Sequence, residues 1–133
     1  MGMKRNKAHE ILEKAYVYVG ICNNRRKNGR GKIGTTEKSV KGRASCIRNQ
    51  SDKDFTPKAY IEIYKTTKAR IEWIESSMRM DLEEYYTHVG NDHFEYAMVN
   101  KNVGNTEFVE RAINIAVEYC NQKRFSYKVV FLP

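Results

Sequence analysis

Two short stretches of alternating side chains predict a β-hairpin near the start of the chain, at residues 16–22 and 32–35. In the first stretch Tyr16 and Tyr18 are two residues apart, so on a strand both rings leave one face while Val17 and Val19 leave the other. The segment between the stretches contains Asn and Gly residues that favour a turn. Further strands are expected at residues 59–64, 94–96 and 126–132.

Helical spacing of apolar residues predicts helices at residues 6–14, 37–49 and 68–85. Gly104-Asn105 is expected to open a last helix, with Asn105 or Thr106 as its N-cap. Thr36 is the expected N-cap of the second helix. The expected buried residues are Val40, Ala44 and Ile47 in the second helix, Ile71, Ile74, Met78 and Leu82 in the third, and Phe108, Ala112, Ile115, Ala116 and Tyr119 in the last.

These elements predict an α/β chain of the α+β type. A length of 133 residues suits a single domain, residues 1–133. Its sheet is expected to be small, mixed but mainly antiparallel, with three or four strands flanked by helices. Residues 50–57 are expected to form a polar loop.

Positive charge is concentrated in one part of the chain. The formal net charge is +8, and the segment 25–48 holds nine Lys and Arg residues against a single acid, Glu37. Such a cluster is typical of proteins that bind a phosphate backbone, and a solvated basic face without a polyanion partner is the alternative. The candidate nucleic-acid-binding residues are Arg25, Arg26, Lys27, Arg30, Lys38, Lys41 and Arg48.

Cysteine usage and hydropathy favour an intracellular, cytoplasmic protein. Cys22, Cys46 and Cys120 lie far apart and form none of the paired spacings of a zinc site or a disulfide scaffold. No apolar run is long enough to cross a bilayer. Residues 1–14 alternate charged with apolar side chains, which is unlike a signal peptide.

An acidic residue, Glu75, borders the apolar stripe of the third helix, and Glu72 is expected on the same side. A carboxylate at the margin of a core needs a partner, because its desolvation is costly. The partner is either a cation in a functional site or Arg79, four residues further along the helix.

The order of these residues resembles the GIY-YIG superfamily of homing and repair endonucleases, and more closely its phage-associated branch whose second motif begins with Lys. Tyr16-Val17-Tyr18 stands at the first motif of that family and Lys32-Ile33-Gly34-Thr35 at the second. Arg43, eleven residues past Lys32, falls where the family has its helix arginine.

Two further segments add to this resemblance. Ile74-Glu75-Ser76-Ser77-Met78-Arg79 is similar to the family's Leu-Glu-x-x-Leu-His, which puts Glu75 at the metal-binding glutamate. Asp92-His93-Phe94-Glu95 resembles a Glu-Trp-Phe element of this branch. The resemblance covers residues 15–96 as a nuclease core and leaves residues 97–133 as a C-terminal extension packed on it.

The chain departs from the family pattern at three positions. The first motif lacks its opening glycine, because Tyr16 stands there when Tyr18 is the motif's tyrosine, and Lys14 stands there when the match is shifted by two residues. Ile47 replaces the Tyr or His that many members have one turn after the arginine. Arg79 replaces the His near the glutamate.

The resemblance implies hydrolysis of DNA phosphodiester bonds with one divalent cation, Mg²⁺ or Mn²⁺, held by Glu75. Tyr18 would position or deprotonate the attacking water, with Tyr16 as the second candidate for this role. Lys32 would supply positive charge beside the tyrosine and could share the role of base. Arg43 would contact the phosphate oxygens.

Two other functions remain open for the sequence. The first is a catalytically weak or inactive protein that binds DNA, or RNA, through the basic segment on the same scaffold. The second is an interaction protein whose last helix forms a dimer face. The sequence identifies no separate recognition module and no oligomeric state.

Overall fold

The computed structural model describes residues 9–22, 30–50, 55–88, 95–97 and 104–133. Within them the elements follow in the order β1 (Ile11–Cys22), β2 (Arg30–Thr36), α1 (Val40–Gln50), β3 (Phe55–Thr67), α2 (Lys68–Leu82), β4 (Thr87–His88), β5 (Glu95–Ala97), α3 (Gly104–Gln122) and β6 (Tyr127–Phe131). The strands form one sheet in the order β4-β5-β2-β1-β3-β6, with antiparallel pairing throughout. The α+β class with a mainly antiparallel sheet is therefore confirmed, and the short strands β4 and β5 extend its edge beyond the four longer strands.

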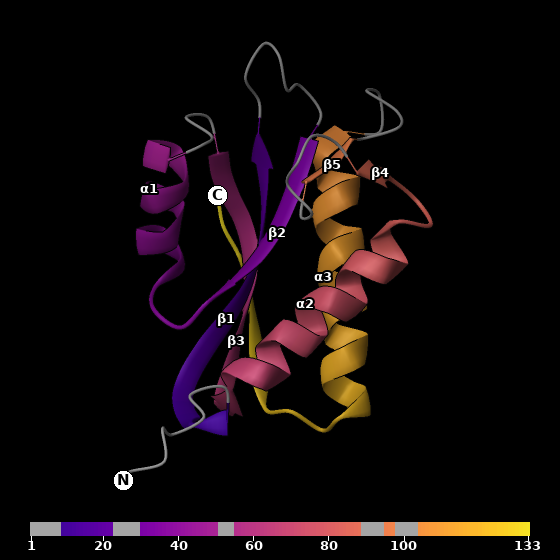
Figure 1. The fold of residues 1–133 in the computed structure, drawn as a ribbon. Helices are drawn as coiled ribbons and strands as arrows, with labels where there is room; N and C mark the ends of the chain where they lie inside the picture. Colours follow the sequence, from indigo (N-terminus) through magenta and orange to yellow (C-terminus); the bar gives the residue numbers. More distant parts are fainter. Residues whose placement is uncertain (1–8, 23–29, 51–54, 89–94, 98–103) are drawn as a thin grey trace, which may run out of the picture.

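The two faces of the sheet are covered by different helices (Figure 1), with α1 on one face and α2 and α3 on the other. Val17 and Val19 of β1 are fully buried in the cluster that includes α2 and α3. Tyr18 belongs to a second, smaller cluster with α1, and Tyr16 packs against that cluster. The alternation of β1 thus separates an aliphatic core from an aromatic one, as expected from the sequence.

Most of the predicted stripe residues of the helices on the aliphatic face are buried, whereas Ile115 and Tyr119 of α3 are only half-buried. Ile71, Ile74, Met78 and Leu82 of α2 are all buried, and the Thr67 hydroxyl caps the helix by accepting a hydrogen bond from the Arg70 backbone N–H at 3.2 Å. The helix ends at Leu82, three residues before its expected end.

The last helix, α3, begins at Gly104, so Asn105 and Thr106 lie within its first turn instead of capping it. Phe108, Ala112 and Ala116 are fully buried against the sheet. These residues complete the protein's own core.

The expected N-terminal helix is wrong for residues 11–14, which belong to β1. Ile11 and Leu12 pair with Thr67 and Thr66 of β3, and the Ile11 side chain is 73% exposed. A helix of about nine residues is marginal in water, whereas the long β3 strand offers a hydrogen-bonding partner along the whole of β1.

Two other boundaries differ from the prediction. β3 begins at Phe55, so residues 55–57 are not a loop, and a register shift between Val19 and Gly20 accommodates the extra residue of β3. α1 begins at Val40, and the Ser39 hydroxyl accepts a hydrogen bond from the Gly42 N–H at 3.0 Å. The Thr36 hydroxyl instead accepts from the Lys38 N–H at 3.2 Å within the turn that leaves β2.

Some expectations fall outside the described residues, namely those for Arg25, Arg26, Lys27, Asp92, His93 and Phe94. None of the helices in the part of the chain that the structure describes has the length and apolar character needed to cross a membrane.

Candidate active site

A tyrosine and a glycine on adjacent strands form the centre of the candidate site. Tyr18 of β1 pairs in register with Gly34 of β2, and its side chain is only 2% exposed. A Cβ atom at position 34 would overlap the Tyr18 hydroxyl and ring. Gly34 therefore makes room for the phenol. Its role was not foreseen, although a glycine inside a predicted strand signals a close approach of this kind.

Arg43 of α1 reaches the Tyr18 phenol. Interaction with the Tyr18 phenol is the largest cause of a raised Arg43 pKa. Burial is the largest influence on the Tyr18 pKa and raises it, while the interaction with Arg43 and the positive charge of Lys32 act in the opposite direction. Because the Tyr18 pKa is raised overall, Tyr18 is a neutral phenol at pH 7.

Lys32 and Glu75 complete the group from two further elements. Lys32 lies opposite Gly20 in the β1–β2 pair, on the same face as Tyr18, and is 7% exposed. Glu75 of α2 is 9% exposed, and its charge raises the pKa of both Tyr18 and Arg43. The charges of Lys32, Arg43 and Glu75 thus all act on Tyr18, and that of Glu75 also acts on Arg43, although α1 and α2 cover opposite faces of the sheet.

Glu72 does not belong to this group. Its side chain is 51% exposed and lies 3.9 Å from the Lys68 ammonium in an ion pair along α2. The expectation that Glu72 shares the buried side of Glu75 is wrong. Glu72 is offset from Glu75 by about 60° around the helix axis, and this offset places it beside Lys68 at the exposed edge of α2.

Tyr16 has different surroundings from Tyr18. Its ring makes an edge contact with Tyr60 of β3, with ring centres 5.7 Å apart. It also lines a cavity of about 410 Å³ beside α1, together with Lys41 and Arg48. Of the two tyrosines considered from the sequence, Tyr18 is the one whose phenol interacts with Arg43.

Among the described residues that were expected to bind nucleic acid, Arg30 begins β2, Lys38 precedes α1, and Lys41 and Arg48 lie on α1. Lys38 and Lys41 are exposed. Arg48 is half-buried, and its guanidinium donates a hydrogen bond to the Phe55 carbonyl at 3.2 Å. Arg48 therefore has a structural contact at the start of β3 in addition to its positive charge.

Ile47 is part of the aromatic core. It is 2% exposed and belongs to the same cluster as Val40, Ala44, Phe55 and Tyr18. In this position the side chain supports the packing of α1 on the sheet, and it presents no polar atom to a ligand.

The residues present suit a weakly held divalent cation. Among the residues that the structure describes, no group of three His, Cys, Asp or Glu side chains gathers in one place. Glu75 offers the oxygen donors that Mg²⁺ prefers, while the positive charges of Lys32 and Arg43 oppose a bare cation. A cation at Glu75 therefore requires water and phosphate oxygens as its remaining ligands.

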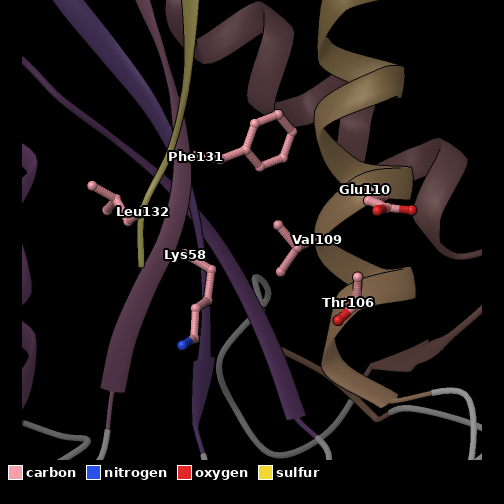
Figure 2. Close-up of a pocket in the computed structure, with 6 residues that line it drawn as sticks. All are labelled: Lys58, Thr106, Val109, Glu110, Phe131 and Leu132. Atoms are coloured by element: carbon pink, nitrogen blue, oxygen red, sulfur yellow. The ribbon is translucent and has the colours of Figure 1, made fainter.

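A second cavity, of about 390 Å³, lies on the other side of the sheet between β6 and α3. Figure 2 shows Phe131 and Val109 projecting into the space between these elements. Its lining contains none of Tyr18, Lys32, Arg43 and Glu75, so it is separate from the candidate site.

Comparisons of the chain with protein-family models, with curated proteins and with solved structures found no match.

Proposed function

We propose that the protein is a divalent-metal-dependent endonuclease that hydrolyses DNA phosphodiester bonds with a GIY-YIG-type site. The observation that supports this proposal is the electrostatic coupling among Tyr18, Lys32, Arg43 and Glu75, which come from β1, β2, α1 and α2. The combination of a carboxylate, a phenol and two cations suits phosphoryl transfer, because it offers a metal ligand, a water-positioning group and donors to phosphate oxygens.

In this mechanism Arg43 stabilises the charge on the non-bridging phosphate oxygens. Its planar guanidinium can donate two parallel hydrogen bonds to phosphate, and the side chain is exposed at its place on α1. In this proposal the interaction with Tyr18 orients the guanidinium before substrate arrives. Such preorganised donors contribute on the order of 10²-fold or more to the rate.

Tyr18 acts as a neutral hydrogen-bonding group in this proposal. Its raised pKa disfavours the phenolate at pH 7, so the hydroxyl positions the attacking water. The water oxygen forms the new bond to phosphorus, and the bond to the leaving nucleoside oxygen breaks. One proton of the attacking water passes to the leaving oxygen and the other passes to bulk water. Lys32 holds positive charge beside the phenol.

Glu75 would hold Mg²⁺ or Mn²⁺ through its carboxylate. When bound, the cation supplies Lewis-acid chemistry, because it acidifies a coordinated water and neutralises charge on the phosphate. The burial of Glu75 places this carboxylate in a less hydrated environment, where its interaction with a cation is stronger than in bulk water.

The test is nicking of supercoiled plasmid by the purified protein in the presence of Mn²⁺, with and without a chelator. Glu75→Gln keeps the size of the side chain and removes its charge, so metal-dependent nicking should fall by about 10²-fold or more, as it should in Arg43→Ala. Glu72→Gln is the matched control, because it makes the same change at an exposed position one turn earlier on α2 and should cleave normally. Nicking at the wild-type rate in both Glu75→Gln and Arg43→Ala would contradict the proposal.

An inactive nucleic-acid-binding protein on the same scaffold is the second candidate, and the burial of Ile47 favours it. The same plasmid assay separates the two functions. Salt-sensitive retention of plasmid without nicking in any tested metal would support binding alone.

A further inference from the structure

The sheet face that carries Tyr18 also carries an aromatic cavity. Tyr60 of β3 pairs in register with Tyr18, and its ring contacts that of Tyr16. The cavity of about 410 Å³ lies between these rings and α1. Its lining includes Tyr16, Ser39, Lys41, Arg48, Pro57 and Tyr60.

The lining combines flat rings with positive charge. Tyr16 and Tyr60 are half-buried and Lys41 is exposed, so rings and cation are accessible together. Arg48 uses one nitrogen for the Phe55 carbonyl, and a guanidinium has five N–H donors in all. The volume falls in the range of about 300–1,000 Å³ that is common for small-molecule sites, which is ample for one nucleobase.

The acid that lies beside Tyr16 on this face is already neutralised. Glu62 pairs in register with Tyr16, and its carboxylate lies 3.2 Å from the Lys14 ammonium. It also accepts a hydrogen bond from the Tyr64 hydroxyl at 3.2 Å. The cavity and its surroundings therefore favour an anionic ligand that has an aromatic group.

The cavity is close to the candidate active site. Tyr16 and Tyr18 are two residues apart on one face of β1, which corresponds to about 7 Å. Lys41 and Arg43 leave α1 on different flanks, because two residues along a helix correspond to a rotation of about 200°. A polymer that reaches both flanks passes over the N-terminal end of α1, where Ser39 and Tyr16 lie.

We propose that this cavity binds an unpaired DNA base from a single-stranded segment beside the cleaved bond, with Tyr16 and Tyr60 contacting the base and Lys41 the adjacent phosphate. This inference rests on the proposed nuclease function and names its substrate class, which is DNA with an unpaired segment. A base inside a duplex is stacked and paired, so it cannot enter a partly enclosed cavity without leaving the helix. An unpaired base is free to stack on an aromatic ring, and this contact tolerates any base sequence.

The first experiment measures binding of the full chain to a labelled single-stranded oligonucleotide and to its duplex by fluorescence anisotropy in the presence of EDTA, so that cleavage plays no part. Tyr60→Leu keeps apolar packing and removes the aromatic face, and we expect at least about tenfold weaker binding of the single strand with little change for the duplex. Tyr60→Phe keeps the ring and should bind the single strand as the wild type does. Equal loss for both DNA forms, or no loss for either, would overturn the inference.

The second experiment uses the unaltered protein, so it does not depend on the folding of a variant. A single-stranded oligonucleotide that contains 5-iodo-deoxyuridine is photo-crosslinked to the protein, and the modified peptide is identified by mass spectrometry. We expect the crosslink at Tyr16 or Tyr60, and a crosslink confined to other peptides would overturn the inference.

The two proposals fail in different ways. If neither plasmid nor an oligonucleotide with an unpaired segment is cleaved but the single strand crosslinks to Tyr60, the nuclease function fails and the base-binding cavity stands. If plasmid is nicked while Tyr60→Leu binds the single strand as the wild type does, the cavity assignment fails and the nuclease function stands.

Discussion

Tyr18 and Gly34 face each other across the β1–β2 pair, and the missing side chain of Gly34 leaves the space that the phenol occupies. The role proposed for Tyr18 of β1 therefore depends on a residue without a side chain at position 34 of β2. This arrangement also explains why the hydroxyl of a buried tyrosine can reach a guanidinium on the helix above the sheet.

We predict that Gly34→Ala disrupts the site more than the fold. The new methyl group overlaps the Tyr18 hydroxyl, so the ring must shift away from Arg43, and overpacking of this kind costs about 1–3 kcal/mol of stability. Metal-dependent nicking should fall by about 10²-fold in the plasmid assay. Gly42→Ala is the control, because its Cβ would meet only the Ser39 hydroxyl, at 3.0 Å, and alanine favours a helix. Equal activity of the two variants would argue against a role for the Tyr18 position.

We predict that Lys38 contributes to DNA binding through a phosphate. Lys38→Gln should reduce the slope of log K against log salt concentration by about 1 for duplex DNA, because one fewer counterion is released on binding. Lys68→Gln makes the same change of charge at an exposed position at the start of α2, so it controls for net charge. Identical slopes for the two variants would remove Lys38 from the DNA interface.

We predict a loss of stability at alkaline pH that depends on Tyr119. Its hydroxyl donates a 2.6 Å hydrogen bond to the Asp81 carboxylate, which is the main cause of a Tyr119 pKa of about 12. An unfolded tyrosine titrates near 10, so between pH 10 and 12 the unfolded chain binds fewer protons than the folded one, and the free energy of unfolding falls as pH rises.

Urea unfolding at pH 9, 10 and 11 measures this contribution. Tyr119→Phe has no proton to lose at this position and should show a smaller decrease than the wild type over that range. Asp81→Asn removes the main cause of the raised pKa and should behave in the same way. A decrease in both variants as steep as that of the wild type would contradict the assignment.

We predict that Cys46 and Cys120 differ sharply in thiol reactivity. Cys46 is exposed on α1, whereas Cys120 is fully buried, and burial raises the pKa of its thiol to about 11. In a Cys22→Ser background, a thiol reagent at pH 8 should modify one cysteine in the native protein and two after unfolding in urea. Rapid modification of both thiols in the native state would show that the core around α3 opens readily.

The secondary structure of the long periodic segments was predictable because many residues in each segment favour the same helix or strand. The stripes of α2 and α3 and the alternation of β3 come from such repeated agreement. The residues 11–14 were mistaken for helix because Ile11 and Leu12 satisfy a helical spacing locally, while the strand that pairs with them lies more than fifty residues away. A pairing partner of this kind is a tertiary influence that no local pattern contains.

The identity of the candidate site residues was predictable from the sequence, whereas their spatial arrangement was predictable only in part. The sequence identifies Tyr18, Lys32, Arg43 and Glu75 through a family resemblance, and the fold brings them within electrostatic reach of one another. The space created by Gly34 was not predicted, because it depends on which residues face each other across the hairpin. The exposure of Glu72 was also missed, since it follows from the angle at which α2 packs on the sheet.

The register of β1 with β2 also limits changes in the length of the segment between these strands. A slip of a single residue in this hairpin would replace Gly34 by Ile33 or Thr35 opposite Tyr18, and neither leaves room for the ring. Insertions or deletions between the two strands should therefore be tolerated only when they keep Gly34 opposite Tyr18. In a set of variants with different numbers of residues between β1 and β2, those that shift this register should lose the proposed nicking activity while remaining folded.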